Sequence, residues 1–254
     1  MFPLRDENPT EIFPIFTLGI IAACVAAWVY LQGAGMSQEA LARSVCAFGT
    51  IPAEVTGHAA AGDPVMLTEQ LACRTDAFGW PTLITSMFLH GSWMHLIGNM
   101  WFLWIFGNNV EDSMGHVRFA VFYLLTGVIA GLAHVVVDPD SLVPTVGASG
   151  AISAIMGAYL VLYPRARVKT LFIIVILIYF VDVPAWVYLV YWLFIQTVSQ
   201  TVQGTASGVA FMAHIGGFLA GVLLIKLFQN RTLVDAKRSH VKLAREDIPR
   251  GGWL

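Results

Sequence analysis

Long stretches without a charged side chain alternate with short polar segments along this chain. Six stretches are free of Asp, Glu, Lys and Arg, and they run over residues 12–38, 77–110, 119–137, 141–164, 170–181 and 183–225. A helix needs about 20 mostly apolar residues to cross the hydrocarbon core of a bilayer. The pattern therefore predicts several membrane-spanning helices.

The last two stretches do not correspond to one helix each. A polar, glycine-bearing segment at residues 199–205 predicts a loop between a span that ends near Val198 and another that begins near Val209. Asp182 and Pro184 interrupt the apolar residues from 168 to 198, which form either one long, broken span or two short ones. We expect Asp182 to cap or kink a helix there.

The distribution of basic residues decides the number of spans. With six spans, all of the 14 Lys and Arg residues except Arg43 and Arg74 lie on one side of the membrane. This is the excess of positive charge that cytoplasmic segments carry. A seventh span would place the basic C-terminal tail outside. We therefore predict an all-α, polytopic membrane bundle of six transmembrane helices, with the N and C termini cytoplasmic.

The composition also indicates a chain that is mainly embedded in the lipid bilayer. Hydrophobic residues make up 57% of the chain and charged residues 12%, and the mean hydropathy is +0.71. Soluble domains carry roughly 25% charged residues. We expect one transmembrane domain over residues 1–229, with an outer loop at 32–75, followed by a solvated cytoplasmic tail at 230–254 that touches anionic lipid. The chain has no basic patch with interleaved aromatic residues, so we expect no nucleic-acid binding.

Two cysteines, Cys46 and Cys73, lie in the outer loop, whereas Cys24 lies within the first span. If that side of the membrane is oxidising, the two loop cysteines can form a disulfide bond. Spacing does not determine connectivity, so a pair of unpaired thiols is the alternative.

Polar residues inside a bilayer are costly and are candidates for function. Counting toward the cytoplasmic side, His95 lies 16 residues before Glu111, Ser149 lies 16 before Arg165, and His214 lies 17 before Arg231. At a rise of 1.5 Å per residue, all three lie about 24–26 Å from the inner boundary. Three spans therefore bring polar groups to one level, near the outer boundary. The other polar candidates are His90, Asn99 and Asp182.

A serine hydroxyl becomes nucleophilic when a base takes its proton, and neutral imidazole suits that task near pH 7. We therefore expect Ser149 and His214 to form a catalytic pair. The small-residue faces 149, 153, 157 and 214, 217, 221 allow their helices to pack closely. The Ser149 backbone N–H, with His95 and Asn99 one turn apart, can bind an oxyanion.

No Asp or Glu lies at this depth on the second, fourth or sixth span, so we expect a dyad and not a triad. Taken alone, the segment Gly147–Gly150 is more often a site of helix packing, and a lone histidine is as often structural. Their coincidence at one depth, on matching small-residue faces, favours catalysis.

These residues resemble the rhomboid family of intramembrane serine proteases. The resemblance rests on segments 90–100, 106–111, 147–150 and 213–217. It implies that Ser149 is the nucleophile, that His214 is the general base, and that His95 and Asn99 hold the oxyanion with the Ser149 amide. It also implies cleavage of transmembrane protein substrates at or near the outer membrane boundary, with membrane lipid as the surroundings and with no metal or cofactor.

The resemblance further implies that loop 32–75 lies partly in the membrane and that the fifth span with its following loop, 185–207, forms a substrate gate. Two features depart from the family. Ser153 stands where an aromatic commonly packs on the catalytic histidine, so either another residue or Ser153 itself orients His214. The first loop also lacks the Trp-Arg pair of some bacterial members.

Two other functions compete with proteolysis. A non-catalytic relative that binds transmembrane segments would be expected to lack Ser149 or His214. A transporter would be expected to show internal repeats and charged groups at mid-bilayer. The acidic residues before the first apolar run are unlike the basic region of a signal peptide, and no Arg-rich presequence is present. We therefore expect a retained first span and a bacterial cytoplasmic (inner) membrane location.

Overall fold

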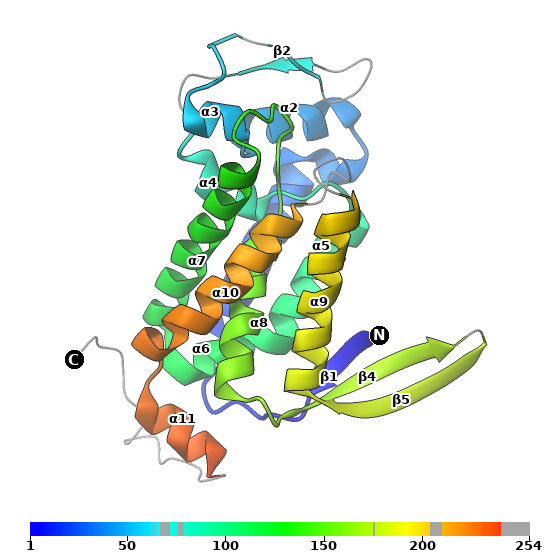
Figure 1. Ribbon diagram of the computed structural model, residues 1–254, viewed down its shortest axis with the longest axis vertical. Helices are drawn as coiled ribbons and strands as arrows, with labels where there is room; N and C mark the ends of the chain where they lie inside the picture. Colours follow the sequence, from blue (N-terminus) through cyan, green and yellow to red (C-terminus); the bar gives the residue numbers. More distant parts are fainter. Residues whose placement is uncertain (63, 67–71, 76–78, 175, 204–209, 240–254) are drawn as a thin grey trace.

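The computed structural model describes residues 1–62, 64–66, 72–75, 79–174, 176–203 and 210–239. Most of them form a bundle of helices that run roughly along the long axis of the molecule (Figure 1). Short helices and a small hairpin cover one end of this bundle. A larger β-hairpin projects sideways at the other end.

The long helices account for most of the apolar stretches of the sequence. In chain order they are α1 (Ile15–Ala26), continued by η1 (Ala27–Leu31); α5 (Trp93–Phe102), continued by η4 (Leu103–Gly107) and α6 (Asn108–Met114); α7 (His116–Val137); α8 (Ser149–Leu162); α9 (Ala185–Gln203); and α10 (Phe211–Phe228). Within the described residues, α7 and α10 are long and apolar enough to cross a membrane, whereas 15–31 and α8 are apolar but shorter.

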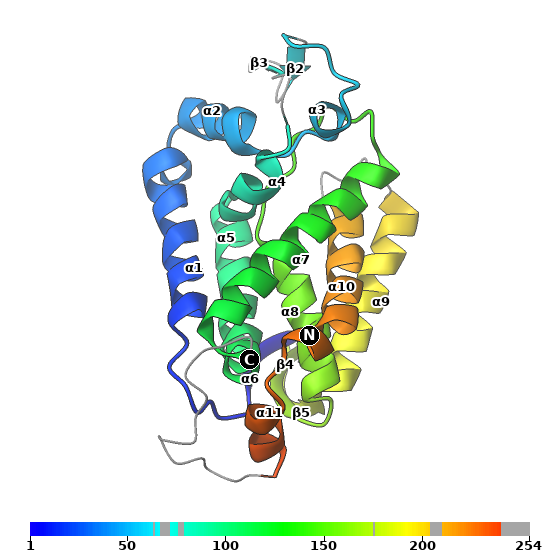
Figure 2. The same ribbon diagram turned by 90° about the vertical axis from the view of Figure 1, so that its left-hand side faces the viewer.

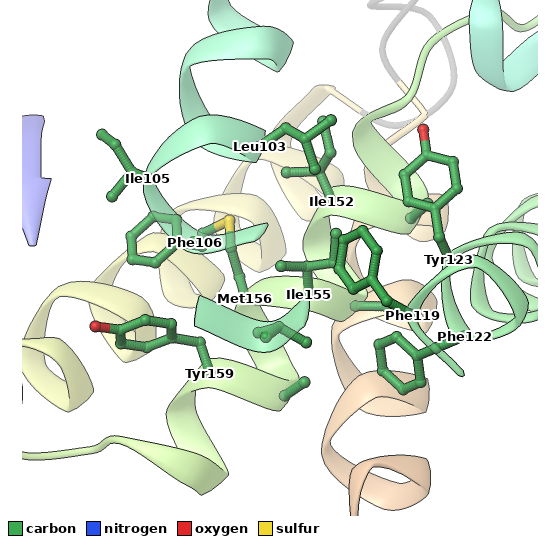
Figure 3. Packing of buried hydrophobic residues seen from close by; sticks show 14 of the residues in the cluster. Leu103, Ile105, Phe106, Phe119, Phe122, Tyr123, Ile152, Ile155, Met156 and Tyr159 are labelled. Carbon is green, nitrogen blue, oxygen red and sulfur yellow. The ribbon is translucent and has the colours of Figure 1, made fainter. Parts of the chain in front are cut away.

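Helix α8 is the centre of the bundle. Every residue from Gly150 to Tyr159 is buried, as expected for a helix that is apolar on all sides. Figure 3 shows how Ile155, Met156 and Tyr159 of α8 pack with Phe106 of η4 and Phe119 of α7. The Phe106 and Tyr159 rings meet edge to face, with centroids 5.1 Å apart. This core holds α8 against its neighbours over the turns that follow Ser149 along the helix.

The predicted helical bundle is confirmed for most of the described chain, but the chain is not all-α, because residues 167–184 form a β-hairpin. Strands β4 (Arg167–Ile174) and β5 (Leu177–Pro184) are antiparallel, and β1 (Phe2–Asp6) pairs with the other edge of β4. An apolar run of this length does not by itself distinguish strand from helix, and its many Ile, Val, Tyr and Phe residues favour strands. The expected span within 168–198 therefore reduces to α9, which begins directly after Pro184.

Asp182 does not cap or kink a helix. It lies in β5 opposite Lys169 of β4, and its Oδ1 is 3.8 Å from Lys169 Nζ. The polar break predicted at 199–205 is also wrong over 199–203, because α9 continues to Gln203. Residues 204–209 lie outside the described part of the chain.

The opposite end of the bundle carries the outer loop predicted at residues 32–75 and the start of the second apolar stretch. Its elements are η2 (Gly33–Gly35), α2 (Gln38–Phe48), α3 (Pro52–Thr56), β2 (Pro64–Met66), β3 (Ala72–Arg74), α4 (Thr82–Thr85) and η3 (Ser86–Phe88). Figure 2 shows α2, α3, β2 and β3 at the upper end of the bundle. Cys46 is disulfide-bonded, and Cys24 is a buried free thiol. The side chain of Cys73, on which the predicted pairing depends, lies outside what the structure describes.

The end of the bundle near β1 is closed by α11 (Arg231–Arg238), where the sequence predicted a solvated tail. Lys237 of α11 is buried, with its Nζ 2.8 Å from Asp112 Oδ2 and 2.5 Å from Asn109 Oδ1. Burial lowers the pKa of the Lys237 ammonium, and Asp112 opposes that shift. This part of the tail is therefore docked on the bundle, while residues 240–254 lie outside the described part.

The N-terminal strand joins the same polar cluster through Asp6. Its Oδ2 accepts hydrogen bonds from the Tyr159 hydroxyl at 2.6 Å and from Asn109 Nδ2 at 2.7 Å. Burial nevertheless raises the pKa of Asp6 to about 6, against the opposing effects of Tyr159 and Lys237. Asp6 of β1 and Lys237 of α11 therefore both form a hydrogen bond with the side chain of Asn109.

Candidate active site

Ser149 is the first residue of α8, where a helix leaves its leading N–H groups without intrahelical acceptors. The chain reaches this position through Gly147, whose φ of +133° is a conformation that glycine tolerates. The Gly147 N–H donates to the Ser86 carbonyl at 2.9 Å. The position of Ser149 is therefore held by a fixed turn, and its N–H lies at the start of the helix, outside the intrahelical hydrogen bonds.

Close contact between α8 and α10 brings His214 to Ser149. A Cβ added at Gly217 would overlap with the Gly150 carbonyl oxygen, and one at Gly221 would overlap with that of Ala154. A Cβ at Gly157 would likewise overlap with the Phe218 carbonyl oxygen. The small-residue faces predicted from the sequence are therefore the faces on which these helices pack.

The Ser149 hydroxyl and the His214 ring are in direct hydrogen-bond contact. Ser149 Oγ is 2.8 Å from His214 Nε2, within the range required for proton transfer from a nucleophile to a base. The two residues are separated by 65 positions in the sequence. The structure thus brings together the pair that depth counting placed at one level.

The other ring nitrogen of His214 contacts a residue that is not among the predicted ones. His214 Nδ1 is 2.7 Å from Oε1 of Gln196, which lies on α9. The rings of Trp192 and Phe211 also approach the His214 ring, with centroids 6.0 and 6.3 Å away. The sequence signal for Gln196 is weak, since it is a single amide in an apolar helix that ends in several polar residues.

Ser153, the departure from the family pattern, has another role. Its hydroxyl donates to the Ser149 carbonyl at 2.6 Å, within the same helix. Of the two alternatives left open by the sequence, the structure favours orientation of His214 by other residues, namely Gln196 and the two aromatic rings.

His95 presents one ring nitrogen to the turn before Ser149. Its Nδ1 accepts a hydrogen bond from the Gly91 N–H at 3.3 Å, so in the neutral ring the proton is on Nε2. A Cβ added at Gly147 would lie 2.8 Å from this Nε2 and 3.6 Å from Ser149 Oγ. The His95 Nε2–H is therefore a donor directed toward the Gly147–Ser149 turn.

Asn99 lies one turn after His95 on α5, and 8% of its surface is exposed. Among the described residues, its Nδ2 has no hydrogen-bond partner. A buried unpaired donor costs free energy, about 1–3 kcal/mol, and such exceptions in folded proteins call for an explanation. No described protein group therefore uses this donor, which lies in the wall of a cavity.

One cavity of about 470 Å³ connects these groups. Ser149, His214, His95 and Asn99 all line it, together with Gln196, and most of the remaining wall is apolar. The described residues contain no group of three His, Cys, Asp or Glu side chains that could hold a metal ion. A carbonyl group entering the cavity would meet a hydroxyl, an imidazole and several hydrogen-bond donors.

Two other predicted polar residues lie outside this arrangement. His90 is fully buried, with its ring centroid 5.1 Å from that of His95. Asp182 lies in the β-hairpin at the other end of the bundle. His134 near the end of α7 was not among the predicted site residues, yet it also lines the cavity, and its Nε2 is 3.1 Å from Thr145 Oγ1.

Comparison with known proteins identifies relatives of this chain. The family model of the Rhomboid domain matches residues 77–231. Rhomboid-like protein 11, chloroplastic, of Arabidopsis thaliana is 31% identical over 160 residues, 58% of this chain and 52% of that protein. Rhomboid protein 1, mitochondrial, of Saccharomyces cerevisiae is 30% identical over 151 residues, 56% of this chain and 40% of that protein.

Presenilin-associated rhomboid-like protein, mitochondrial, of Mus musculus is 28% identical over 148 residues, 56% of this chain and 37% of that protein. The chain thus spans about half or less of the length of these relatives. The matched region contains all four side chains that line the cavity and were predicted from the sequence.

Proposed function

Because this chain belongs to the rhomboid family, as the match over more than half of its length establishes, we propose that it is an intramembrane serine endopeptidase. Membership in the family makes it a helical integral membrane protein. The proposed substrates are transmembrane proteins, cleaved at or near the outer membrane boundary. The observation that carries the proposal is the 2.8 Å contact between Ser149 Oγ and His214 Nε2 in a cavity that also holds the unpaired Asn99 amide.

In the proposed reaction, Ser149 Oγ attacks the scissile carbonyl carbon while His214 Nε2 takes the hydroxyl proton. The carbonyl oxygen becomes an oxyanion, which accepts hydrogen bonds from Asn99 Nδ2, His95 Nε2–H and the Ser149 N–H. Collapse of this intermediate breaks the C–N bond, and His214 returns its proton to the leaving amine. Water activated by His214 then hydrolyses the acyl ester on Ser149.

The cavity geometry supports the assignment of the oxyanion donors. His95 and Asn99 lie on one face of α5, and the Ser149 N–H lies at the start of α8. The donors are fixed by separate helices that do not have to rearrange when charge develops, which is the property that makes such sites effective.

The proposed topology has six spans with both termini on the cytoplasmic side. The spans are 15–31, 93–114, 116–137, 149–162, 185–203 and 211–228. Two observations support it: β1 and α11 meet at Asn109, and Ser149 begins α8 at the end that faces the predicted outer loop. Helix α8 is short for a span, but neighbouring helices surround it and shield its ends from lipid.

Several predictions from the sequence are not tested by the structure and stay predictions. The division into a domain of 1–229 and a tail of 230–254 is one, and the bacterial cytoplasmic membrane is another. The relatives described above carry chloroplastic or mitochondrial names, so they give no support to a bacterial location. The substrate gate at 185–207 also stays a prediction, and its last part lies outside the described residues.

A non-catalytic protein that binds transmembrane segments is the second candidate function. Such a protein has no need for a serine hydroxyl and an imidazole in hydrogen-bond contact, or for an unpaired buried amide beside them. The geometry therefore favours catalysis.

The test is cleavage of a single-pass transmembrane substrate by the purified protein in liposomes. Wild type is expected to produce fragments, whereas Ser149→Ala and His214→Ala are expected to produce none above background. Ser141→Ala is the matched control, because this serine lies in the loop before α8 and does not line the cavity. Equal product from wild type and Ser149→Ala would overturn the proposal.

A fluorophosphonate probe tests the nucleophile without a protein substrate. The probe is expected to label wild type and Ser141→Ala but not Ser149→Ala. Labelling that persists in Ser149→Ala would identify a different nucleophile.

A further inference from the structure

We propose that Gln196 is a positioning residue that sets the tautomer and the ring orientation of His214. This inference rests on the proposed function, because it concerns how the base of the dyad is kept in its working form. The observation that carries it is the 2.7 Å contact between Gln196 Oε1 and His214 Nδ1, on the side of the ring opposite Ser149.

The contact determines which nitrogen carries the proton. The Gln196 carbonyl oxygen has no proton to donate, so Nδ1 must be the protonated nitrogen of the neutral ring. Nε2 then has a free lone pair and accepts a hydrogen bond from the Ser149 hydroxyl. In the other tautomer, Nε2 would carry the proton, and the ring could not act as a base toward Ser149.

Among the described residues around His214, the other side chains do not compete with Gln196 for this role. Trp192 and Phe211 present aromatic rings to the His214 ring, and Ser153 directs its hydroxyl to the Ser149 carbonyl. Neither ring offers an oxygen acceptor to Nδ1. Without Gln196, the Nδ1–H would be left unpaired in an enclosed site, where an unpaired polar group is most costly.

An amide suits this position better than the carboxylate of a soluble protease. A carboxylate inside a bilayer is expensive unless it is paired, whereas the amide supplies the same oxygen acceptor without a net charge. The orientation of the base is thereby tied to α9. That helix is held at its first turn by backbone bonds from Ala185 and Trp186 to the carbonyls of Ala166 and Pro164.

The test compares an acceptor with a non-acceptor at position 196. Gln196→Met has a similar length but no oxygen, and Gln196→Glu keeps an oxygen acceptor in either protonation state. Loss of one neutral hydrogen bond that holds the tautomer is expected to lower kcat for Gln196→Met about tenfold, with little change in KM. Gln196→Glu is expected to restore most of this loss. Thr197→Val is the control, because the Thr197 hydroxyl bonds to Leu193 within α9.

A spectroscopic measurement separates positioning from a general structural effect. In protein labelled with ¹⁵N-histidine above pH 8, the His214 signals, assigned by their loss in His214→Ala, are expected to show a protonated Nδ1 and an unprotonated Nε2. Gln196→Met is expected to shift them toward the other tautomer, whereas Thr197→Val is expected to leave them unchanged.

Failure of this inference differs from failure of the proposed function. If Ser149→Ala abolishes cleavage while Gln196→Met keeps the wild-type kcat and tautomer, the protease assignment stands and the role of Gln196 is refuted. A rise in KM with unchanged kcat would also refute it, because it would place Gln196 in substrate binding. If Ser149→Ala cleaves as wild type does, the dyad itself is refuted.

Discussion

Gly217 of α10 packs directly against the backbone carbonyl of Gly150 on α8. This contact lies one turn beyond His214 and one residue beyond Ser149, so it fixes the separation of the two helices at the dyad. The distance from Ser149 Oγ to His214 Nε2 therefore depends on a position that has no side chain.

Substitution of Gly217 by alanine tests this dependence. The added methyl group would overlap with the Gly150 carbonyl and would have to push α10 away from α8. Overpacking of this kind costs about 1–3 kcal/mol, and we expect a lower thermal unfolding midpoint in detergent together with a large loss of cleavage. Gly19→Ala in α1 is the control, because a methyl group there meets no atom within 4 Å and Gly19 does not line the cavity. Full activity in Gly217→Ala would contradict the role of this contact.

Substitution of Asn99 by alanine is expected to change activity and stability in different directions. Loss of one oxyanion donor lowers kcat by about 10²–10³-fold, with little change in KM. The folded protein loses no hydrogen bond of the Nδ2 group, because the structure shows no partner for it among the described residues. The thermal midpoint should therefore stay the same or rise. Parallel measurement of kcat and unfolding checks both points, and an unchanged kcat would remove Asn99 from the site.

We expect Gly147→Ala to lose both stability and cleavage rate, for two reasons that can be tested separately. Its φ of +133° strains any residue with a Cβ, and the methyl group would also lie 2.8 Å from His95 Nε2. Gly57→Ala serves as the control, because it combines a φ of +75° with open space. Both variants should lose stability, but only Gly147→Ala should lose most of its cleavage rate. A similar loss of rate in both would show that strain alone accounts for the effect.

The pKa of Asp6 predicts a pH-dependent stability at the end of the bundle that holds β1. Burial raises this pKa from 3.8 to about 6, so the folded protein binds the proton more tightly than the unfolded chain. The resulting stabilisation is fully present below pH 3.8 and is lost as the pH rises through 6. Asp6→Asn mimics the protonated form and keeps an oxygen acceptor for Tyr159.

We therefore expect Asp6→Asn to unfold at a higher temperature than wild type at pH 7, and the difference to disappear near pH 4. Thermal unfolding of both proteins at pH 4, 5, 6 and 7 measures this difference directly. A constant difference across the range would show that Asp6 does not titrate there.

The sequence predicted the site better than it predicted the elements between the spans. Ser149, His214, His95 and Asn99 could be placed together because a bilayer imposes one length scale, so that residue counts become depths. The glycines at 217 and 221 indicated the packing face directly. Gln196 could not be found in this way, because its role depends on the rotation of α9 relative to α10, which the sequence does not encode in a local pattern.

The β-hairpin at 167–184 shows the limit of hydropathy. A run such as 171–181 is as apolar as a span, and apolar residues occupy both faces of β5, which is exposed along most of its length. The run therefore lacks the alternation that normally identifies a strand. The docking of α11 was missed for a related reason. Lys237 is a charged residue in a charged segment, and its burial follows from Asp112 and Asn109, more than 120 positions away in the sequence.

His214 lies on the last of the long apolar helices, whereas Ser149 lies on the central one. During synthesis, a ribosome must therefore translate more than 60 further residues after the nucleophile before its base exists. Until α10 has entered the membrane and packed on α8, the nascent chain carries an ordinary serine with no partner to activate it. The proposed protease would therefore have no activated serine at the site of membrane insertion while its own synthesis is incomplete.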